Sequence, residues 1–294
     1  VEAVLGTIRR LGVDRLIAAK RSRRRDLIVG LIVERLLDPG SKLAATRLWK
    51  TTTLAEELEI EQADVDEVYE ALGWLYGRQE AIERKLAARH LSEGGRALYD
   101  VTSSYYYGRA CRLARYGHDR DGKAGRKIIV YGVLTDREGR PVAVEVYPGQ
   151  TGDPSTVPDQ AEKLRGNFGL QRIVLVGDRG MLTETQLDKL REYEGIGWIS
   201  ALRSPAIRQL VEAGHLQRSL FDEQHLAEIR SPDYPDERLV ACWNPLLGEQ
   251  RRRTRGELLE ATEKELSRIA REVSRRTRTP LRAEQIALKV GKVL

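Results

Sequence analysis

The stretch Ala97-Leu98-Tyr99-Asp100-Val101-Thr102 decides the fold, because the spacing of apolar residues changes there from helical to strand-like. Its β-branched and aromatic residues favour a strand. Further strand-like runs follow at 127–136, 141–147, 172–176 and 196–202, and helical patterns at 157–168 and 185–194 separate the later ones. Arg137-Glu138-Gly139 predicts a hairpin turn between the second and third strands. This order of elements predicts an α/β fold in which helices flank a mixed sheet.

The residues before this stretch are predicted to be helical. Apolar residues at helical spacing fill 26–37, and Asp38-Pro39-Gly40 ends that helix. Ser41 is placed to cap a following helix that runs through Trp49. Two further helices are predicted at 65–76 and 79–90. We therefore assign residues 1–92 to a helical N-terminal region.

The regular alternation is lost after residue 203. Residues 204–250 have a mixed pattern with a strand-like piece at 238–243, and 257–273 predicts a strongly charged helix. The last residues, 290–294, are apolar and have the pattern of a strand. The pattern thus defines three regions: 1–92, 93–203 and 204–294.

Composition excludes several classes of protein. The 294 residues include 50 Lys and Arg against 44 Asp and Glu, for a net charge of +6, and 41% are hydrophobic. This balance is typical of a globular, mildly basic chain rather than a disordered one. No apolar run approaches the roughly 18 residues of a membrane helix, so we expect no membrane partner. Cys111 and Cys242 are too few for a disulfide framework or a structural zinc site, which favours a cytoplasmic location.

Two aspartates are candidates for metal ligands. Alternation puts Asp100 on the same strand face as Leu98 and Thr102. Asp178 follows Gly177 just beyond the run 172–176, where open α/β sheets have their ligand crevices. Two carboxylates from adjacent strands would suit Mg²⁺ or Mn²⁺. A structural alternative stays open for each: Asp178 could cap a turn, and Asp100 could accept a neighbouring backbone amide.

Short motifs in a specific order surround these aspartates. They are LYDVTSSY (98–105), GHDRD (117–121), YGVL (131–134), DREGRP (136–141), PGQTGD (148–153) and VGDRGM (176–181), after LDPGSK (37–42). In order and spacing the chain resembles bacterial insertion-sequence transposases of the DDE type, which have a ribonuclease-H-like catalytic core. The resemblance covers essentially the whole chain.

The resemblance implies a fold, a site and an activity. It implies a ribonuclease-H-like core in 93–203, preceded by the helical region 1–92, a candidate for DNA-end binding, and followed by an incomplete insertion region at 204–294. Asp100 and Asp178 would be the first two catalytic acids, and they would hold two Mg²⁺ or Mn²⁺ ions about 3.5–4 Å apart. The implied reaction is phosphodiester cleavage and strand transfer at insertion-sequence ends. Tyr105-Tyr106-Tyr107 is interpreted as packing and not as the nucleophile of a tyrosine recombinase.

The third acid that the resemblance implies is not found in the sequence. The family has it as a Glu in a helix with the pattern Tyr, two residues, Arg, three residues, Glu, six residues, Lys. Tyr234 is followed three residues later by Glu237 instead of Arg, and the Glu residues of 257–273 lack the pattern. We therefore expect the chain to stop before this helix and to cleave transposon ends poorly or not at all. Two alternatives remain: a truncated, non-catalytic DNA-binding or regulatory protein of the element, and a metal-dependent structure-selective nuclease.

Basic residues cluster at 20–25, 109–127 and 251–255. Such clusters can neutralise DNA phosphates with little sequence preference, although each could also be a solvated helix face or loop. The segment 109–127 joins the strand of Asp100 to the next strand, so it is the preferred DNA contact. Candidate DNA-binding residues are Arg112, Arg115, Arg120, Lys123, Arg126, Lys127 and Arg179. The expected partners are the transposon terminal inverted repeats, target DNA and a second copy in a homodimer, acting at the nucleoid.

Overall fold

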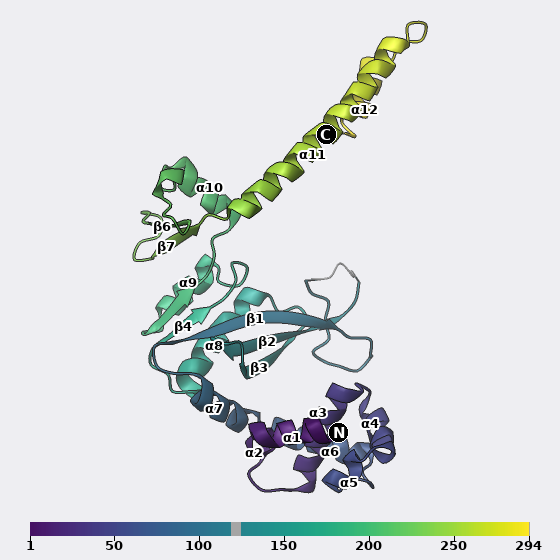
Figure 1. Cartoon of the computed structure of the whole chain (residues 1–294), viewed down its shortest axis with the longest axis vertical. Coiled ribbons are helices and arrows are strands. Elements are labelled where there is room, and N and C mark those ends of the chain that lie inside the picture. The colour runs from purple at the N-terminus through teal and green to yellow at the C-terminus, as the bar shows by residue number, and fades with distance from the viewer. Residues whose placement is uncertain (119–124, 294) are drawn as a thin grey trace. The chain divides into compact units, whose positions relative to one another are not determined.

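The computed structural model describes residues 1–118 and 125–293 (Figure 1). The chain divides into two compact units, Val1–Leu202 and Arg203–Leu294. Within the described residues, no helix combines the length and the hydropathy that crossing a membrane requires.

The first part of unit 1 is helical. Its helices are α1 (Glu2–Leu11), α2 (Val13–Ile17), α3 (Arg23–Leu37), α4 (Lys42–Leu48), α5 (Leu54–Leu58), α6 (Val65–Tyr76) and α7 (Gln79–His90), with a 3₁₀ turn η1 at Trp49–Thr51. The ends of α6 and α7 agree with the prediction. The predicted cap of α4 is confirmed, because Ser41 Oγ accepts the amide of Ala44 at 3.1 Å. Leu27, Ile28, Val33 and Trp49 are buried in one apolar cluster between the helices.

A mixed five-stranded sheet forms the second part of unit 1. The strands are β1 (Gly95–Tyr105), β2 (Ile128–Asp136), β3 (Pro141–Pro148), β4 (Ile173–Val176) and β5 (Ile196–Ile199), in the spatial order β3-β2-β1-β4-β5. β2 is antiparallel to β1 and β3, whereas β4 is parallel to β1 and β5. The predicted fold class, a mixed sheet flanked by helices, is confirmed.

One face of the sheet forms a second apolar core in unit 1. Ala97, Tyr99 and Val101 of β1 pack there with apolar side chains of α8 (Val157–Glu162), a π turn η3 (Lys163–Asn167) and α9 (Glu184–Arg191). A 3₁₀ turn η2 (Asp153–Thr156) leads into α8. The alternate residues of β1, including Asp100 and Thr102, point to the opposite face and are exposed. The alternation therefore places Asp100 on the open face, where its carboxylate stays in contact with solvent.

A glycine of the YGVL motif makes room on the buried face. Gly132 on β2 pairs with Val101, and a Cβ at Gly132 would lie 2.2 Å from Tyr99 Oη. The ring of Tyr99 therefore occupies the space that a side chain at position 132 would need. Burial raises the pKa of the Tyr99 hydroxyl.

Helix α7 covers the free edge of the sheet at β3. Gln79 Nε2 donates to the carbonyl of Val144 at 2.8 Å, and Glu83 Oε1 accepts the amide of Val144 at 3.1 Å. The other oxygen of Glu83 accepts from Lys163 Nζ at 3.1 Å, and Lys163 also binds Glu145 at 2.6 Å. Burial would lower the pKa of the Lys163 ammonium, but its hydrogen bonds to Glu145 and Glu83 raise the pKa overall. These contacts fix α7 to the sheet.

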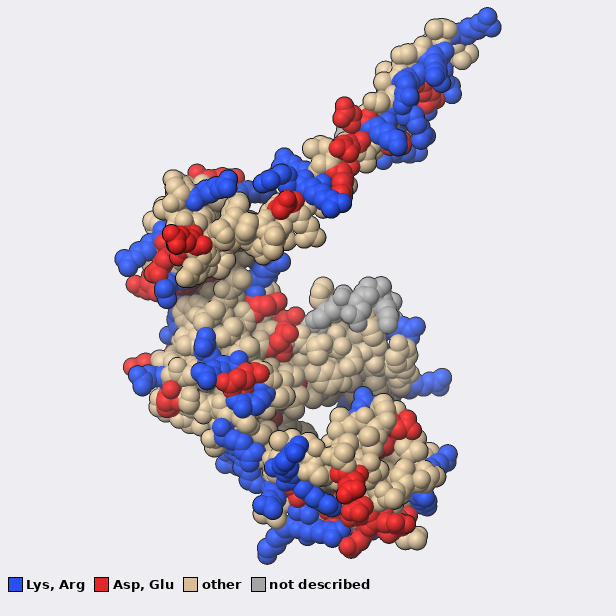
Figure 2. All heavy atoms as spheres, in the orientation of Figure 1, with Lys and Arg blue, Asp and Glu red and all other residues tan. Residues whose placement is uncertain are grey.

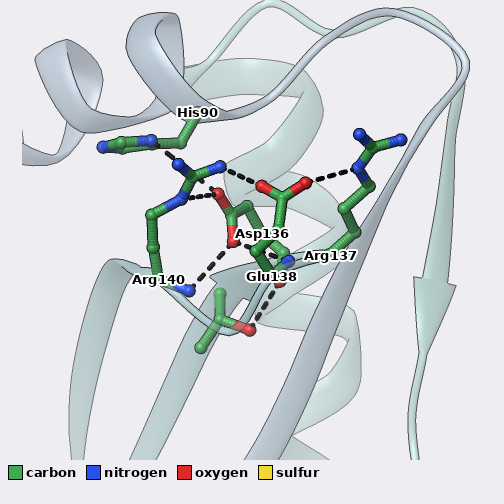
Figure 3. A network of polar contacts seen from close by, with 6 residues as sticks. His90, Asp136, Arg137, Glu138 and Arg140 are labelled. Carbon is green, nitrogen blue, oxygen red and sulfur yellow. Dashed lines mark hydrogen bonds and ion pairs between the residues drawn. The ribbon is translucent and has the colours of Figure 1, made fainter.

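The predicted hairpin turn between β2 and β3 is built on one buried carboxylate (Figure 3). Asp136 Oδ1 accepts the amides of Glu138 and Arg140, both at 2.9 Å, and Oδ2 accepts from Arg140 Nε at 2.6 Å. His90 Nδ1 lies 3.7 Å from the same carboxylate. Gly139 completes the turn with a φ of 80°, which favours glycine. Asp136 therefore has a structural role.

Unit 2 contains a small hairpin and a long helix. Its elements are α10 (Ser204–Glu212), a 3₁₀ turn η4 (Arg218–Leu220), β6 (Leu226–Ile229), β7 (Leu239–Cys242), α11 (Pro245–Arg275) and α12 (Ala283–Val290). The helix predicted at 257–273 lies in the C-terminal part of α11, which begins earlier and has 31 residues. Asn244 caps its start by accepting the amide of Leu247 at 3.1 Å.

The strand predicted at 290–294 is wrong. Val290 ends α12, residues 291–293 form a turn, and Leu294 lies outside the described residues. The apolar ending looked strand-like in isolation, but the preceding Ala, Gln and Leu residues favour a helix. An ion pair of 2.5 Å between Lys289 and Glu272 links α12 to α11. Contact with α11 therefore stabilises the helical alternative.

Candidate active site and nucleic-acid interface

The parallel pairing of β1 with β4 sets the positions of the two aspartates. Leu98 on β1 is the register partner of Val176 on β4. Asp100 lies two residues beyond Leu98, and Asp178 lies two residues beyond Val176. Asp100 on β1 and Asp178 in the turn just after β4 therefore lie beyond the same end of the paired segment.

Asp100 is held by its own strand. Its Oδ1 accepts the amide of the next residue, Val101, at 2.8 Å. The side chain is exposed, and within the described part of the chain its Oδ2 has no hydrogen-bond partner. The structural alternative considered for Asp100, a bond to a neighbouring amide, is thus present, and it leaves one carboxylate oxygen available to a ligand.

Asp178 is held by the turn that follows β4. Its Oδ1 accepts the amides of Gly180 at 2.9 Å and Met181 at 2.8 Å. Its carbonyl accepts from Ser200 Oγ at 3.2 Å, which ties the turn to the end of β5. Met181 is buried, so the motif VGDRGM fixes this turn by an apolar anchor as well as by the carboxylate. Asp178 therefore caps a turn, as the structural alternative expected, while its Oδ2 has no partner among the described residues.

The two carboxylates fit a divalent cation of the oxygen-seeking kind. Mg²⁺ is commonly bound through one or two protein carboxylates, with waters and substrate phosphates completing the shell. Asp100 and Asp178 each have one oxygen fixed by backbone amides and a second one available, both on solvent-accessible side chains. No group of three or more His, Cys, Asp or Glu residues with metal-binding geometry occurs in 1–118 and 125–293.

The candidate DNA-binding residues do not all lie together. Three of them, Arg115, Arg126 and Lys127, lie beside Ile128 at the start of β2. Arg126 and Lys127 precede Ile128 directly, and two backbone hydrogen bonds join Arg115 to Ile128. Arg112 is exposed in the same loop. Arg120 and Lys123 lie outside the described residues.

Arg179 is separate from that group, because it is next to Asp178 at the end of β4. Tyr105, which pairs with Ile128, lies five positions along β1 from Asp100. The segment 106–127 between β1 and β2, which we call the basic loop, therefore begins roughly 17 Å from Asp100 along the strand, at about 3.4 Å per residue.

Two glycines anchor the basic loop to the sheet. A Cβ on Gly117 would lie 1.7 Å from the carbonyl oxygen of Gly149, and a Cβ on Gly149 would lie 2.1 Å from the carbonyl oxygen of Ile128. The amide of Gly149 also donates to the carbonyl of Leu113 at 2.9 Å. Because the backbones approach so closely, only glycine fits at both positions. This contact explains why the motifs GHDRD and PGQTGD each include a glycine.

The other two basic clusters differ from this loop in their ion pairing. In 20–25, Arg21 binds Asp26 at 2.8 Å, Arg23 binds Glu67 at 2.7 Å, and Arg25 is largely buried. Most of that cluster therefore stabilises the helical part of unit 1. In 251–255, Arg253 pairs with Glu257 at 2.9 Å, and basic side chains alternate with acidic ones along α11 (Figure 2).

Sequence reasoning missed three features of the structure. They are the contact of Ser200 with Asp178, the structural role of Asp136 in the hairpin turn, and the exposure of Tyr107 and Tyr116 on the basic loop. Only the tyrosines have a counterpart in the sequence, because they stand among several Arg and Lys residues in 106–127.

A comparison with protein families identifies the family of this chain. A sequence model of the family described as "Transposase DDE domain" matches residues 96–287, which is more than half of the chain. The chain therefore belongs to the DDE transposase domain family. No curated protein matches it in sequence.

Solved structures of transposases show distant similarity. A chain of the piggyBac transposase synaptic complex with hairpin DNA is 14% identical, with a TM-score of 0.39, over 75% of this chain and 51% of that one. A Mos1 transposase paired-end complex with the left transposon end is 12% identical, with a TM-score of 0.26, over 66% of this chain and 72% of that one. A Mos1 mariner paired-end complex with Mn is 15% identical, with a TM-score of 0.24, over 67% of this chain and 66% of that one. The chain thus spans about half the length of the piggyBac chain.

Proposed function

We propose that this chain is the DDE core of a DNA transposase, with Asp100 and Asp178 as two of its catalytic acids and metal ligands. The observation that carries the proposal is their position beyond the same end of the parallel pair β1 and β4, both exposed and with one carboxylate oxygen of each available. The membership of the DDE transposase domain family supports it. The proposed substrates are the terminal inverted repeats of the element and target DNA, which would be met at the nucleoid.

The protein groups prepare this site before any ligand arrives. The amides of Gly180 and Met181 fix the orientation of Asp178, and the amide of Val101 fixes Asp100. Such backbone bonds hold both carboxylates in one rotamer, so less ordering is needed on binding. When bound, Mg²⁺ or Mn²⁺ would supply Lewis-acid stabilisation of negative charge on the phosphodiester, and a complete site would hold two ions. The chemistry requires no Ser, Tyr or Cys nucleophile.

The assignments of region follow from the same proposal. Residues 93–203 would form the catalytic core, and 204–294 an insertion region. Residues 1–92 would contact the DNA ends. Arg21 and Arg23 are already bound in ion pairs, whereas Arg24 forms none with the residues that the structure describes, so Arg24 is the better candidate for a DNA contact. A homodimer would pair two ends.

Mn²⁺ binding tests the carboxylate pair directly. Electron paramagnetic resonance of the wild-type protein titrated with Mn²⁺ should show bound ion, and Asp100→Asn and Asp178→Asn should each weaken the binding at least tenfold. Asp66→Asn is the matched control, since Asp66 is exposed on α6 and has no metal-binding neighbour in the described structure. Equal Mn²⁺ binding in wild type and both site variants would contradict the proposal.

Nicking of supercoiled plasmid in Mg²⁺ or Mn²⁺ gives an independent readout. Any metal-dependent nicking by the wild type should disappear in Asp178→Asn and persist in Asp66→Asn. Nicking that survives in both Asp100→Asn and Asp178→Asn would show that the reaction uses other residues.

A further inference from the structure

An apolar groove lies open between helices in the first part of unit 1 (Figure 1). Helix α3 packs against α6, and the groove between them and the start of α4 has a volume of about 530 Å³. Leu36, at its margin, is 66% exposed. Exposed apolar surface is unfavourable in water, and a continuous patch of it marks a place that a partner covers. The apolar residues that line the groove are Ile28, Leu31, Ile32, Leu36, Leu72 and Leu75.

Two exposed tyrosines stand beside this groove on α6. Tyr69 precedes the groove residue Leu72 by three positions and Tyr76 follows it by four, so all three share one side of the helix. Tyr76 is 78% exposed, and no described residue bonds its hydroxyl. A projecting side chain next to a groove makes a surface complementary to itself. The projection of one copy can fill the groove of a second copy, which does the same in return.

One polar group in the groove suits the tip of a tyrosine. Glu34 is buried and lines the groove. Its Oε1 accepts the amide of Gly40 at 2.9 Å, and no described residue donates to its Oε2. The hydroxyl of tyrosine is a donor at the end of an apolar ring. A tyrosine therefore fits a groove that has apolar walls and one carboxylate oxygen without a donor.

The charges at the groove favour a protein partner over DNA. Arg35 and Lys42 line the groove, and neither has an ion pair with a described residue. Glu34 balances one of them, and the exposed Asp38, two residues before the groove residue Gly40, balances the other. A surface for DNA phosphates needs an excess of positive charge, which this one lacks. Two copies of a balanced surface can approach without net repulsion, and Arg35 or Lys42 of one copy can face Asp38 of the other.

We propose that this groove binds a second copy of the chain, and that Tyr76 of each copy inserts into the groove of the other beside Glu34. Two-fold symmetry makes the contact twice and closes the dimer. Tyrosine is also among the residues that most often anchor protein interfaces. The inference rests on the proposed function only in that it assigns a surface to the proposed homodimer, and it makes no use of the carboxylate pair.

Sedimentation velocity of the full chain at increasing concentration tests this surface. The wild type should pass from monomer to dimer. Tyr76→Ala should raise the dissociation constant of the dimer at least about tenfold, because the two-fold contact loses its anchor twice. Tyr76→Phe keeps the ring and should weaken the dimer less. Tyr116→Ala is the matched control and should dimerise as the wild type, since Tyr116 is 65% exposed but does not line the groove.

The groove side of the contact has its own variant. Leu36→Glu places a charge at the exposed margin of the groove and should weaken the dimer as Tyr76→Ala does, whereas Leu11→Glu, at a 60% exposed residue of α1, should not. A mixture of the Tyr76→Ala and Leu36→Glu proteins still offers an intact tyrosine from one copy and an intact groove from the other. The mixture should therefore associate more tightly than either variant alone. Circular dichroism checks the fold of each variant, and if one is unfolded the other decides with its control.

The outcomes separate this surface from the proposed function. A wild type that stays monomeric, a dimer that Tyr76→Ala and Leu36→Glu leave unchanged, or a mixture no tighter than its components overturns the reciprocal contact. Mn²⁺ binding that depends on Asp100 and Asp178 would persist in those cases, and the transposase proposal would stand. A dimer that responds to these variants as expected but binds no Mn²⁺ supports the surface and contradicts the proposed metal site.

Discussion

At the scale of single residues, the contact between Gly117 and Gly149 leads to a sharp prediction. Gly149→Ala would place a methyl group 2.1 Å from the carbonyl of Ile128, and backbone at that distance cannot move aside cheaply. We expect a loss of about 2 kcal/mol in the free energy of unfolding, the range of local backbone strain. Urea denaturation followed by circular dichroism measures it.

Gly152 provides the matched control for this substitution. A Cβ on Gly152 meets nothing within 4 Å, and the residue has an ordinary φ of −78°. Gly152→Ala should therefore be neutral or slightly stabilising. A Gly149→Ala protein as stable as Gly152→Ala would show that the basic loop is not anchored by this contact.

The carboxylate of Asp136 predicts a stability that depends on acid. Burial would raise its pKa, but the amides of Arg140 and Glu138 and the guanidinium of Arg140 hold the pKa below its usual value. A carboxyl whose pKa is lower in the folded state than in the unfolded state stabilises the fold. This stabilisation is complete above the unfolded-state pKa of about 3.9 and is lost as the pH falls through the lower folded-state pKa. Asp136→Asn should thus lower the melting temperature at pH 7, and the difference from wild type should shrink as the pH falls below about 4.

Thermal melts between pH 3 and pH 7 test this, with Asp66→Asn as an exposed control. A difference between wild type and Asp136→Asn that is constant over that range would contradict the assigned role. The residue also shows the limit of sequence reasoning. The turn at 137–139 is predictable from its residue types, but the structural role of Asp136 is not, because its partners include backbone amides that a sequence pattern does not display.

At the scale of elements, α7 illustrates what periodicity can and cannot predict. The bounds of the helix follow from the sequence, because its turns repeat locally. Its attachment to the sheet does not, since Gln79 and Glu83 reach Val144, which is more than 60 residues away in sequence. The same reasoning explains why the strand predicted at 290–294 is wrong. The short apolar run fits a strand or a helix locally, and contact with α11 favours the helix α12.

Because α7 is attached to the sheet through Glu83, we expect replacement of this one side chain to lower the free energy of unfolding strongly. Glu83 is buried and accepts bonds from Gln79, Val144 and Lys163. Glu83→Ala would leave the amide of Val144 without this partner and the largely buried Lys163 with Glu145 alone, so we expect a loss of roughly 3 kcal/mol in the free energy of unfolding. Glu83→Gln still accepts the amide of Val144 and should cost less. Denaturation of the three proteins in urea measures the order, and a Glu83→Ala protein as stable as wild type would contradict the role of this contact.

The sheet shows how far the candidate site could be predicted. The strands, the hairpin and the position of Asp178 after β4 follow from alternation and from the motif VGDRGM. The register of β1 with β4, which brings Asp100 and Asp178 to the same end of the pair, does not, because parallel pairing joins strands that are far apart in the chain and has no local signature. The exposure of Asp100 is likewise a result of which sheet face the helices cover.

At the scale of the whole molecule, the division at Leu202 and Arg203 predicts how the chain unfolds. Each unit has its own internal contacts: the apolar core around β1 in unit 1, and in unit 2 the pairing of β6 with β7 and of α11 with α12. α11 has no buried residue, so unit 2 gains less from apolar burial than unit 1. We expect unit 2 to unfold first, and unit 1 to unfold in a separate, cooperative transition.

Tryptophan positions make this measurable. Trp243 belongs to unit 2, whereas Trp49 is fully buried in unit 1. In a urea titration of the full chain, a Trp243→Phe variant should lose the early change in fluorescence and keep the later one. A fragment of residues 1–202 should unfold with the midpoint of that later transition, because its core is complete without unit 2. A single transition in the full chain, or a fragment that does not fold, would mean that the two units depend on each other for stability.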